Sequence, residues 1–207
     1  MESKELSIVI VTFKSEGKIF NCLDSIPSSI KVTVIENSNN ENFKREIEIK
    51  YKNVKCILTG SNKGYAVANN IGLNNVDTKF ALVLNPDTVL DKNAISNFFI
   101  TEKKLDDFWL IGPASGQQVI NDFKDNHILE VDNLKGFAIF FNMEKFKDKI
   151  FFDENYFLYF EEIDLCKTVN LHGGKIYINK NINIFHEGGK SVDSKFELEI
   201  EKSRNWH

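Results

Sequence analysis

The chain has 207 residues, of which 42% are hydrophobic and 27% are charged. This composition is typical of a folded globular protein and excludes a disordered or fibrous chain. The length favours one domain with a sizeable core. A formal net charge of -4 excludes the strongly basic character that tight binding to DNA or RNA requires, so nucleic acid is not an expected partner.

The cysteines and the N-terminus indicate a cellular compartment. Cys22, Cys56 and Cys166 are widely spaced and form no CxxC pair, so neither a disulfide framework nor a zinc site is expected. We expect buried thiols in a reducing cytosol. The N-terminal residues are charged, and the apolar run Ile8–Val11 is too short for a signal peptide or a spanning helix. A cytoplasmic protein is therefore predicted.

Apolar β-branched runs alternate with helical patterns in the first half of the chain. Leu6–Phe13 has the nearly continuous apolar pattern of a strand buried on both faces of a parallel sheet. A helix is expected to begin at Ser15 or Glu16 and to end near Pro27. The next expected elements are a strand at 31–35, a polar turn at 37–40, a charged helix to Tyr51, a strand at 54–58, a helix at 64–76 and a strand at 80–84. This alternation predicts right-handed crossovers and an α/β sheet.

The rhythm of the pattern changes after Asp91. The expected elements are a helix at 91–103, hairpin-like segments around 117–120, 128–131 and 134–142, a helix at 161–171, and late strands at 175–178 and 182–186. No segment rich in Pro, Gly or Ser marks a linker. We therefore expect residues 1–207 to form one domain, with a single mixed central sheet flanked by helices.

A carboxylate follows the strand at 80–84 directly. In open α/β sheets ligands bind at the carboxyl ends of the strands, and Pro86 keeps Asn85 extended, so Asp87 is delivered to that edge. A carboxylate there could hold a hard divalent cation against a diphosphate. The alternative is a simple Asn-Pro-Asp turn.

The segment 59–72 also follows a strand and enters a helix. Gly64 allows a close approach of the backbone, and Ala66 keeps the helix slim. Asn69 and Asn70 are poor residues for a helix interior, which favours a polar role. The glycine spacing and the missing Lys-Ser/Thr pair exclude a Walker loop.

Two more polar groups close strands. Glu36 could accept a hydrogen bond from a nucleobase imide, although a capping or solvated Glu explains it equally well. His186 opens a glycine-rich loop that permits a mobile flap, in which Lys190 and Ser191 could meet phosphate oxygens. A lone His is more often structural or solvated.

The densest cluster of candidate residues is the segment 152–166. Aromatic residues precede three acids, Glu161, Glu162 and Asp164, in the first turn of the expected helix, where the helix dipole favours negative charge. Helix capping explains one or two of these acids. Three beside an aromatic wall favour a site, because low dielectric and like charges raise a carboxyl pKa toward that of a general base.

These motifs resemble the family 2 inverting glycosyltransferases of the GT-A fold, the nucleotide-diphospho-sugar transferase fold. The likeness is greatest to the rhamnosyltransferase-like branch that builds O-antigens and other bacterial surface polysaccharides. It extends from Ile8 to Asn205 and rests on order as well as content. The matching segments are Thr12 after a strand, 36–38, 62–66, 84–87, 157–165 and 186–191.

The resemblance implies a nucleotide-sugar-binding half at 1–90 and an acceptor and catalytic half at 91–207. Asp87 matches the last acid of the family's Asp-x-Asp-type motif for Mg²⁺ or Mn²⁺, and Asn85 replaces the first. His186 matches a further metal ligand or a diphosphate contact. The residues expected to contact the nucleotide-sugar donor are Thr12, Glu36, Asn62, Lys63, Gly64, Tyr65, Ala66, Asn69, Asn85, Lys190 and Ser191.

Glu162 falls where the family has the Asp of a Glu-Asp pair, its general base. The extra methylene leaves the assignment open among Glu162, Glu161 and Asp164, of which the last two are expected to hold the acceptor or support the site. The implied acceptor is a glycan on a lipid carrier, and the implied location is cytoplasmic with at most peripheral contact to the inner membrane face. The final residues, 204–207, resemble a point where relatives continue with another helix.

Two rival functions stay open on sequence grounds. A sugar nucleotidyltransferase would need a glycine-rich N-terminal loop, which the segment 11–15 lacks. A non-catalytic relative could bind a nucleotide sugar within an assembly complex. The phenylalanines of 137–157 could indicate a lipid-linked acceptor, but we expect most of them to pack in the core.

Overall fold

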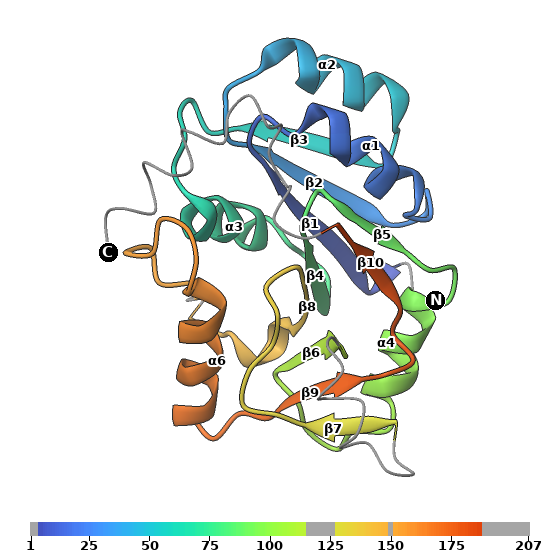
Figure 1. The fold of residues 1–207 in the computed structure, drawn as a ribbon, viewed down its shortest axis with the longest axis vertical. Helices are drawn as coiled ribbons and strands as arrows, with labels where there is room; N and C mark the ends of the chain where they lie inside the picture. Colours follow the sequence, from blue (N-terminus) through green and yellow to red (C-terminus); the bar gives the residue numbers. More distant parts are fainter. Residues whose placement is uncertain (1–3, 115–126, 149–150, 188–207) are drawn as a thin grey trace.

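The computed structural model describes residues 4–114, 127–148 and 151–187. Its centre is an eight-stranded mixed sheet in the order β3-β2-β1-β4-β8-β6-β9-β7, as Figure 1 shows. These strands are β1 (Leu6–Thr12), β2 (Lys31–Glu36), β3 (Val54–Leu58), β4 (Phe80–Leu84), β6 (Leu110–Pro113), β7 (Ile128–Glu130), β8 (Ala138–Asn142) and β9 (Ile176–Asn179). The sheet therefore contains strands from both halves of the chain.

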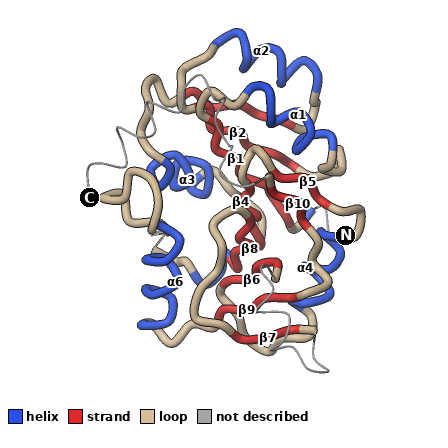
Figure 2. The backbone as a smooth tube through the Cα atoms, in the orientation of Figure 1, coloured by secondary structure: helices blue, strands red, loops and turns tan. Residues whose placement is uncertain are grey.

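Helices cover both faces of the sheet. They are α1 (Glu16–Asp24), α2 (Glu41–Lys50), α3 (Tyr65–Asn74), α4 (Ala94–Glu102) and α6 (Glu161–Leu171), with the short 3-10 helix η3 (Met143–Lys145). Figure 2 shows α3 and α6 on one side of the strands and α1, α2 and α4 on the other. No helix in the described ranges is long and apolar enough to cross a bilayer.

Alternate residues of each central strand enter two separate cores. In β1, Ile8 and Ile10 pack on the side of α1, α2 and α4, whereas Val9 and Val11 pack on the side of α3 and α6. This two-sided burial explains the continuous apolar runs in the sequence. Most of the phenylalanines are core residues, as expected: the rings of Phe98 and Phe140 stack with their centroids 4.9 Å apart.

Strand direction decides which strand ends meet. Strands β1, β2, β3 and β4 are parallel, so their carboxyl ends share one edge, where Thr12 lies opposite Glu36. β8 runs antiparallel to β4, and Ala138 pairs with Leu84. The start of β8 therefore lies at the same edge as the end of β4.

The predicted hairpin-like arrangement of 128–131 and 134–142 is wrong. β7 pairs with β9, and β8 inserts between β4 and β6. All five residues of β8 are buried, because both of its faces are covered. A strand with two buried faces fills the centre of a sheet, so it is not available to pair with the edge strand β7. The segment 117–120 lies outside the described residues.

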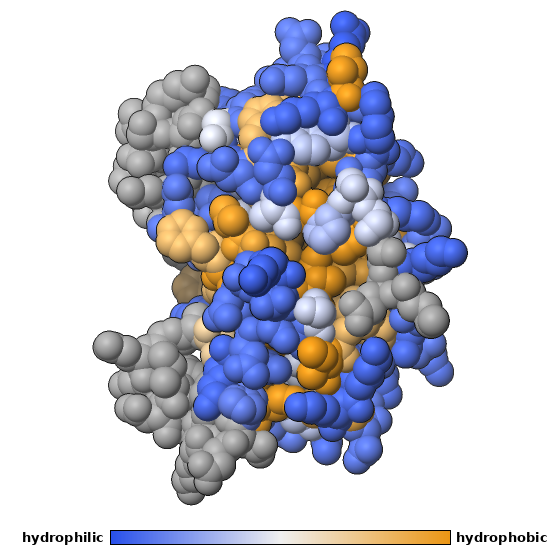
Figure 3. Space-filling view, turned by 90° about the vertical axis from the view of Figure 1, so that its right-hand side faces the viewer, coloured by the Kyte–Doolittle hydropathy of each residue, from blue (hydrophilic) through white to orange (hydrophobic). Residues whose placement is uncertain are grey.

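A second, two-stranded sheet was not predicted as such. β5 (Thr88–Leu90) pairs antiparallel with β10 (Ile184–His186). Figure 3 shows apolar side chains gathered in the centre of the face that carries these strands. A pocket of ≈ 390 Å³ opens there, lined mainly by β5, β10 and their neighbours. Among the described residues, none of the predicted site residues lines this pocket. The pocket therefore does not mark the predicted site.

Candidate active site

The turn after β4 holds Asp87 at the shared edge of the sheet. Thr88 Oγ1 donates a 2.7 Å hydrogen bond to the carbonyl oxygen of Asn85, which closes the turn around Pro86. Cys22, on α1, packs beneath with Sγ 3.5 Å from Thr88 Oγ1. Asp87 is only 4% exposed, although it lies in a loop. This burial distinguishes Asp87 from the solvated carboxylate that an ordinary Asn-Pro-Asp turn would present.

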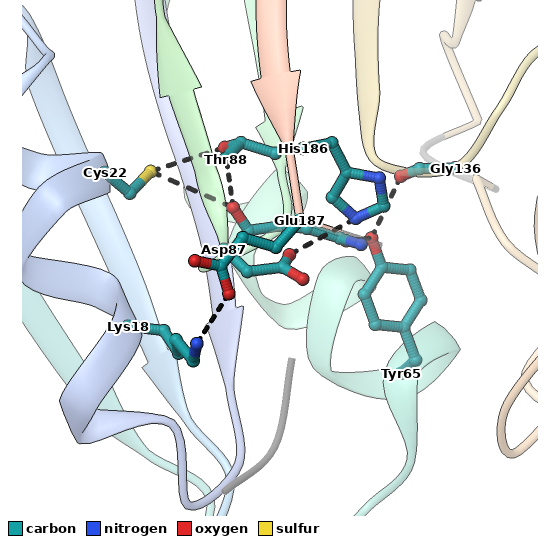
Figure 4. A network of polar contacts seen from close by, with 9 residues as sticks. Lys18, Cys22, Tyr65, Asp87, Thr88, Gly136, His186 and Glu187 are labelled. Carbon is teal, nitrogen blue, oxygen red and sulfur yellow. Dashed lines mark hydrogen bonds and ion pairs between the residues drawn. The ribbon is translucent and has the colours of Figure 1, made fainter. Parts of the chain in front are cut away.

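His186 lies against this carboxylate. Because β10 pairs with β5, His186 stands opposite Thr88, and its Nε2 is 3.3 Å from Asp87 Oδ1, as Figure 4 shows. The ring of Phe137 stacks on the imidazole at 4.6 Å and 12°, which fixes the plane of the ring. The structure thus brings together two residues that are 99 positions apart and that the resemblance assigns to a metal.

The pair is suited to hold part of a divalent metal site. A carboxylate oxygen and an imidazole nitrogen at this separation can bind one ion, and both side chains lie at the edge where a diphosphate would enter. Within the described ranges no group of three or more His, Cys, Asp or Glu residues could hold a metal. Donor oxygens and water would have to complete the coordination of a six-coordinate ion.

The hydroxyl of Tyr65 connects the turn after β4 to the segment that begins β8. It lies 2.9 Å from Asn85 Oδ1 and 3.3 Å from the carbonyl oxygen of Gly136, and it can donate to either. Burial raises the pKa of this hydroxyl, and the negative charges of Glu161, Glu162 and Asp87 contribute to the rise. Tyr65 is therefore a neutral donor placed within electrostatic reach of Asp87 and of the acids of α6.

The acids of α6 lie in three different environments. Glu161 is 5% exposed, and its Oε2 has no hydrogen-bond partner among the described residues. Burial raises the pKa of Glu161 to about 7, against a lowering by its own backbone N–H, and the negative charge of Glu162 adds to the rise. Glu162 is half-buried against Gly136, where a Cβ would lie 3.4 Å from the Glu162 side chain. Asp164 is half-buried and donates its backbone N–H to Phe160.

Asn37 is a candidate site residue for which the sequence predicted no role of its own. It follows β2, is 2% exposed, and its Nδ2 donates to Asn62 Oδ1 at 2.9 Å and to the carbonyl oxygen of Gly64 at 3.2 Å. Its Oδ1 accepts from the N–H of Lys63. Asn37 therefore shapes the loop that enters α3. Its position directly after a buried parallel strand was the available signal.

Glu36 holds its own loop in this structure. Its Oε1 accepts from the N–H and the hydroxyl of Ser38, and its Oε2 accepts from the N–H of Asn40 at 2.5 Å. Both carboxylate oxygens are thus engaged by the turn after β2, as the capping alternative expects. Contact with a nucleobase stays a prediction.

The other predicted donor contacts divide into exposed and enclosed residues. Asn62 and Lys63 are exposed at the loop surface. Thr12, Ala66 and Asn69 are at most 1% exposed, so the structure does not bring their side chains to the surface. Lys190 and Ser191 lie outside the described residues.

An ion pair from α1 also reaches this site. Lys18 Nζ lies 2.5 Å from Glu187 Oε2, and the N–H of Glu187 donates to the carbonyl oxygen of Asp87 at 3.3 Å (Figure 4). The two side chains are 29% and 39% exposed, so the pair borders solvent. No local signal in the sequence links residues separated by 169 positions.

Residues 7–164 match the family described as Glycosyl transferase family 2. The chain belongs to this family. The match begins in β1 and ends in the first turn of α6, so it includes Asp87 and all three acids of α6. His186 lies beyond it.

Individual relatives agree with this assignment. The low-salt glycan biosynthesis hexosyltransferase Agl10 of Haloferax volcanii is 25% identical over 188 residues, which cover 78% of this chain and 60% of Agl10. The mannosyltransferase PcManGT of Pyrobaculum calidifontis, solved with GDP-Man and Mn2+, has a TM-score of 0.75 at 11% identity over 96% of this chain and 60% of its own. TarS 1-349 of S. aureus has a TM-score of 0.68 at 17% identity, over 86% and 58%.

These likenesses show a GT-A fold, an α/β architecture with one large mixed sheet flanked by helices. The chain covers 60% or less of the length of each of these three relatives.

Proposed function

We propose that the chain is the catalytic part of an inverting glycosyltransferase that moves a hexosyl group from a nucleoside-diphosphate sugar to a hydroxyl of a glycan. Family membership supports the reaction class, and the hexosyltransferase relative supports the transferred group. Neighbouring folds bind GDP-Man or UDP together with Mn2+. The observation that carries the proposal is the pair of Asp87 and His186, linked through Tyr65 to the edge that carries Glu162.

In the proposed reaction, Asp87 and His186 have one task and Glu162 has another. Asp87 and His186 would hold Mg²⁺ or Mn²⁺, which neutralises the charge of the leaving diphosphate when it is bound. Glu162 takes the proton from the acceptor hydroxyl as general base. The acceptor attacks the anomeric carbon from the side opposite the diphosphate, which inverts that carbon without a covalent enzyme intermediate. Tyr65 holds the turn at Asn85 in register with the start of β8.

A panel of UDP-, dTDP- and GDP-sugars, including dTDP-rhamnose for the branch that the sequence resembles, tests donor binding. At a concentration of about 100 Kd a bound donor should raise the unfolding temperature by about 5–10 °C in the presence of MnCl₂. Asp87→Ala should abolish this rise. Asp77→Ala, which removes an exposed carboxylate paired with Lys31, is the matched control and should keep it.

The outcomes separate the rival functions. If no sugar nucleotide raises the unfolding temperature, the proposed function is wrong. Binding without metal-dependent release of nucleoside diphosphate would identify a non-catalytic nucleotide-sugar-binding relative instead. Release of a nucleoside monophosphate with a sugar phosphate would indicate nucleotidyltransferase chemistry.

The acceptor and its location are part of the same proposal. We infer a lipid-linked glycan presented at the inner face of the cell membrane, with the chain in the cytoplasm in at most peripheral contact. Transfer to a glycan primer supports this assignment. Efficient transfer to a protein side chain, with none to a glycan, would contradict it.

A further inference from the structure

Four apolar side chains are exposed beside the acids of α6. Phe157 is 37% exposed, Tyr159 40%, Phe160 57% and Ile163 45%, and we call this set the aromatic lip. Figure 1 shows its loop at the rim of the molecule, above α6 and next to α3. Exposed apolar residues that gather in one place mark an interaction site more often than scattered ones do.

The loop that carries the three aromatic residues of the lip is anchored to α3. The carbonyl oxygen of Phe157 accepts from the N–H of Tyr65 at 2.7 Å, and a Cβ on Gly64 would lie 2.6 Å from that same oxygen. Asn70, also on α3, forms two hydrogen bonds with the backbone of Phe152, at 2.8 and 3.0 Å. The exposure of the aromatic rings is therefore a property of a tethered loop.

The backbone at the lip adopts an unfavourable conformation. Tyr159 and Phe160 have φ values of 71° and 70°, in the left-handed region. This conformation costs roughly 1–2 kcal/mol for each residue with a side chain, whereas glycine adopts it freely. Two consecutive aromatic residues at such positions suggest that the rings themselves have a use.

The lip lies at the N-terminus of α6, the helix end that carries Glu162. Phe160 occupies the N-cap position of α6. It immediately precedes Glu161 and lies two positions before Glu162. An acceptor hydroxyl that gives its proton to Glu162 must place its own sugar ring within a few ångströms of that carboxylate. In the chain, the lip residues Phe160 and Ile163 lie within two positions of Glu162 and provide exposed apolar surface at the start of α6.

The negative charge of the segment around the lip favours some classes of ligand over others. Residues 151–166 contain five acids and no Lys, Arg or His. An anionic phospholipid surface attracts basic segments and would be repelled here. A neutral sugar ring offers an apolar C–H face for the rings and hydroxyls for the carboxylates, so it matches both features of the surface.

We propose that the aromatic lip binds a neutral glycan acceptor, with the ring of Phe160 stacked on the sugar face and Tyr159 beside it. The proposal rests on the proposed function, because it requires an acceptor at Glu162. It makes Phe160 a residue that determines acceptor affinity and leaves donor binding to Asp87 and His186.

The test compares two substitutions at one backbone position. Phe160→Leu keeps an apolar side chain but removes the ring, and Phe160→Tyr keeps the ring. Binding is measured on an array of neutral oligosaccharides built from hexoses and N-acetylhexosamines. Phe160→Leu should weaken binding about tenfold and Phe160→Tyr by no more than about twofold. Leu171→Ala, which truncates a 77% exposed residue at the other end of α6, should bind as the wild type does.

Other outcomes would contradict the proposal that the aromatic lip binds the acceptor. Wild-type protein that binds no glycan on the array, or Phe160→Leu protein that binds like the wild type, would overturn the proposal. A loss of flotation with phosphatidylcholine and phosphatidylglycerol vesicles in Phe160→Leu, with unchanged glycan binding, would make the lip a membrane contact. Donor-induced stabilisation, measured on the same proteins, is expected to be unchanged, so a failed lip is distinguishable from a failed transferase assignment.

Discussion

Glu161 and Glu162 are neighbours in the chain, yet the fold gives them different properties. Glu161 turns into the protein, where burial raises its pKa to about 7. Glu162 faces the segment that begins β8, next to Gly136. On a helix, successive residues point about 100° apart, so adjacent acids cannot serve the same surface. Of the two, only Glu162 is open enough to meet an acceptor.

The first prediction concerns the general base. Glu162→Gln should lower kcat on the order of 10²–10⁴-fold, because the amide cannot take the acceptor proton, while donor binding and folding persist. Steady-state kinetics on a glycan acceptor measure this effect, with the exposed Asp77→Asn, outside the proposed site, as the matched control. Near-normal turnover in Glu162→Gln, together with a collapse in Glu161→Gln or Asp164→Asn, would move the base to that neighbour.

The second prediction concerns the buried acid. Because the folded-state pKa of Glu161 lies near 7 and its ordinary value is 4.5, the folded protein binds more protons between these values. This group therefore lowers the stability of the protein as pH rises from about 4.5 to 7. Glu161→Gln removes the titration, so it should raise the free energy of unfolding by about 3 kcal/mol more at pH 8 than at pH 4.

Denaturant unfolding at the two pH values measures this difference. Glu46→Gln, on the exposed face of α2, is the control, and its effect should stay within about 0.5 kcal/mol at both values. An equal effect of Glu161→Gln at pH 4 and pH 8 would contradict the burial of a carboxyl that titrates near neutrality.

At the scale of elements, the start of α3 and the loop before α6 depend on each other. Gly64 precedes α3 with a φ of 84°, and the carbonyl oxygen of Phe157 occupies the space that a Cβ would need. The N–H of Tyr65 donates to that oxygen. This close approach joins the loop before α3 to the loop before α6, and it depends on the absence of a side chain at Gly64.

The third prediction compares two glycines that both have a positive φ. Gly60 has a φ of 78°, and a Cβ added there would have nothing within 4 Å, whereas a Cβ on Gly64 would meet Phe157 at 2.6 Å. Gly60→Ala should cost about 1–2 kcal/mol of stability from the backbone alone. Gly64→Ala should cost a further 1–3 kcal/mol, roughly, from the clash and from a ψ of 172°, which with this φ is essentially confined to glycine. Equal losses in thermal or denaturant unfolding would show that the contact contributes nothing.

At the scale of the whole molecule, the sheet assembles a site from distant parts of the chain. The parallel strands β1 to β4 bring their carboxyl ends to one edge, and the antiparallel β8 adds its beginning. The β5–β10 ribbon then returns His186 to Asp87. Among the described residues only these two candidate ligands lie together, so in the proposed function the substrate would complete the metal site.

The fourth prediction follows from this incomplete ligand set. Mn²⁺ and a nucleoside diphosphate should each stabilise the protein more in the presence of the other, because the diphosphate oxygens complete the coordination. Mg²⁺ should support binding less well, since its sites are built from oxygen and one ligand here is an imidazole nitrogen. Calorimetric titrations of each ligand with and without the other measure the coupling. Tight binding of Mn²⁺ alone would indicate a complete protein site.

Much of this architecture is determined locally, which is why the sequence alone predicted it. The strands β1 to β4 and the helices between them follow from apolar runs and helical periodicity over a few residues. The burial of all three cysteines and the delivery of Asp87 to the end of β4 were predicted for similar local reasons and are seen in the structure. Family motifs placed the chain in its fold because they depend on residue order.

The tertiary structure decided what depends on contacts between distant residues. β8 lies between β4 and β6 because it can pair with both of them in the centre of the sheet. The local sequence of a strand does not reveal which strands it will pair with. The role of Asn37 depends on the loop at 62–64, and the approach of His186 to Asp87 depends on a ribbon of three-residue strands. The different burial of Glu161 and Glu162 arises only when α6 packs against the sheet, because the sequence states that two acids are adjacent but not which one faces inward.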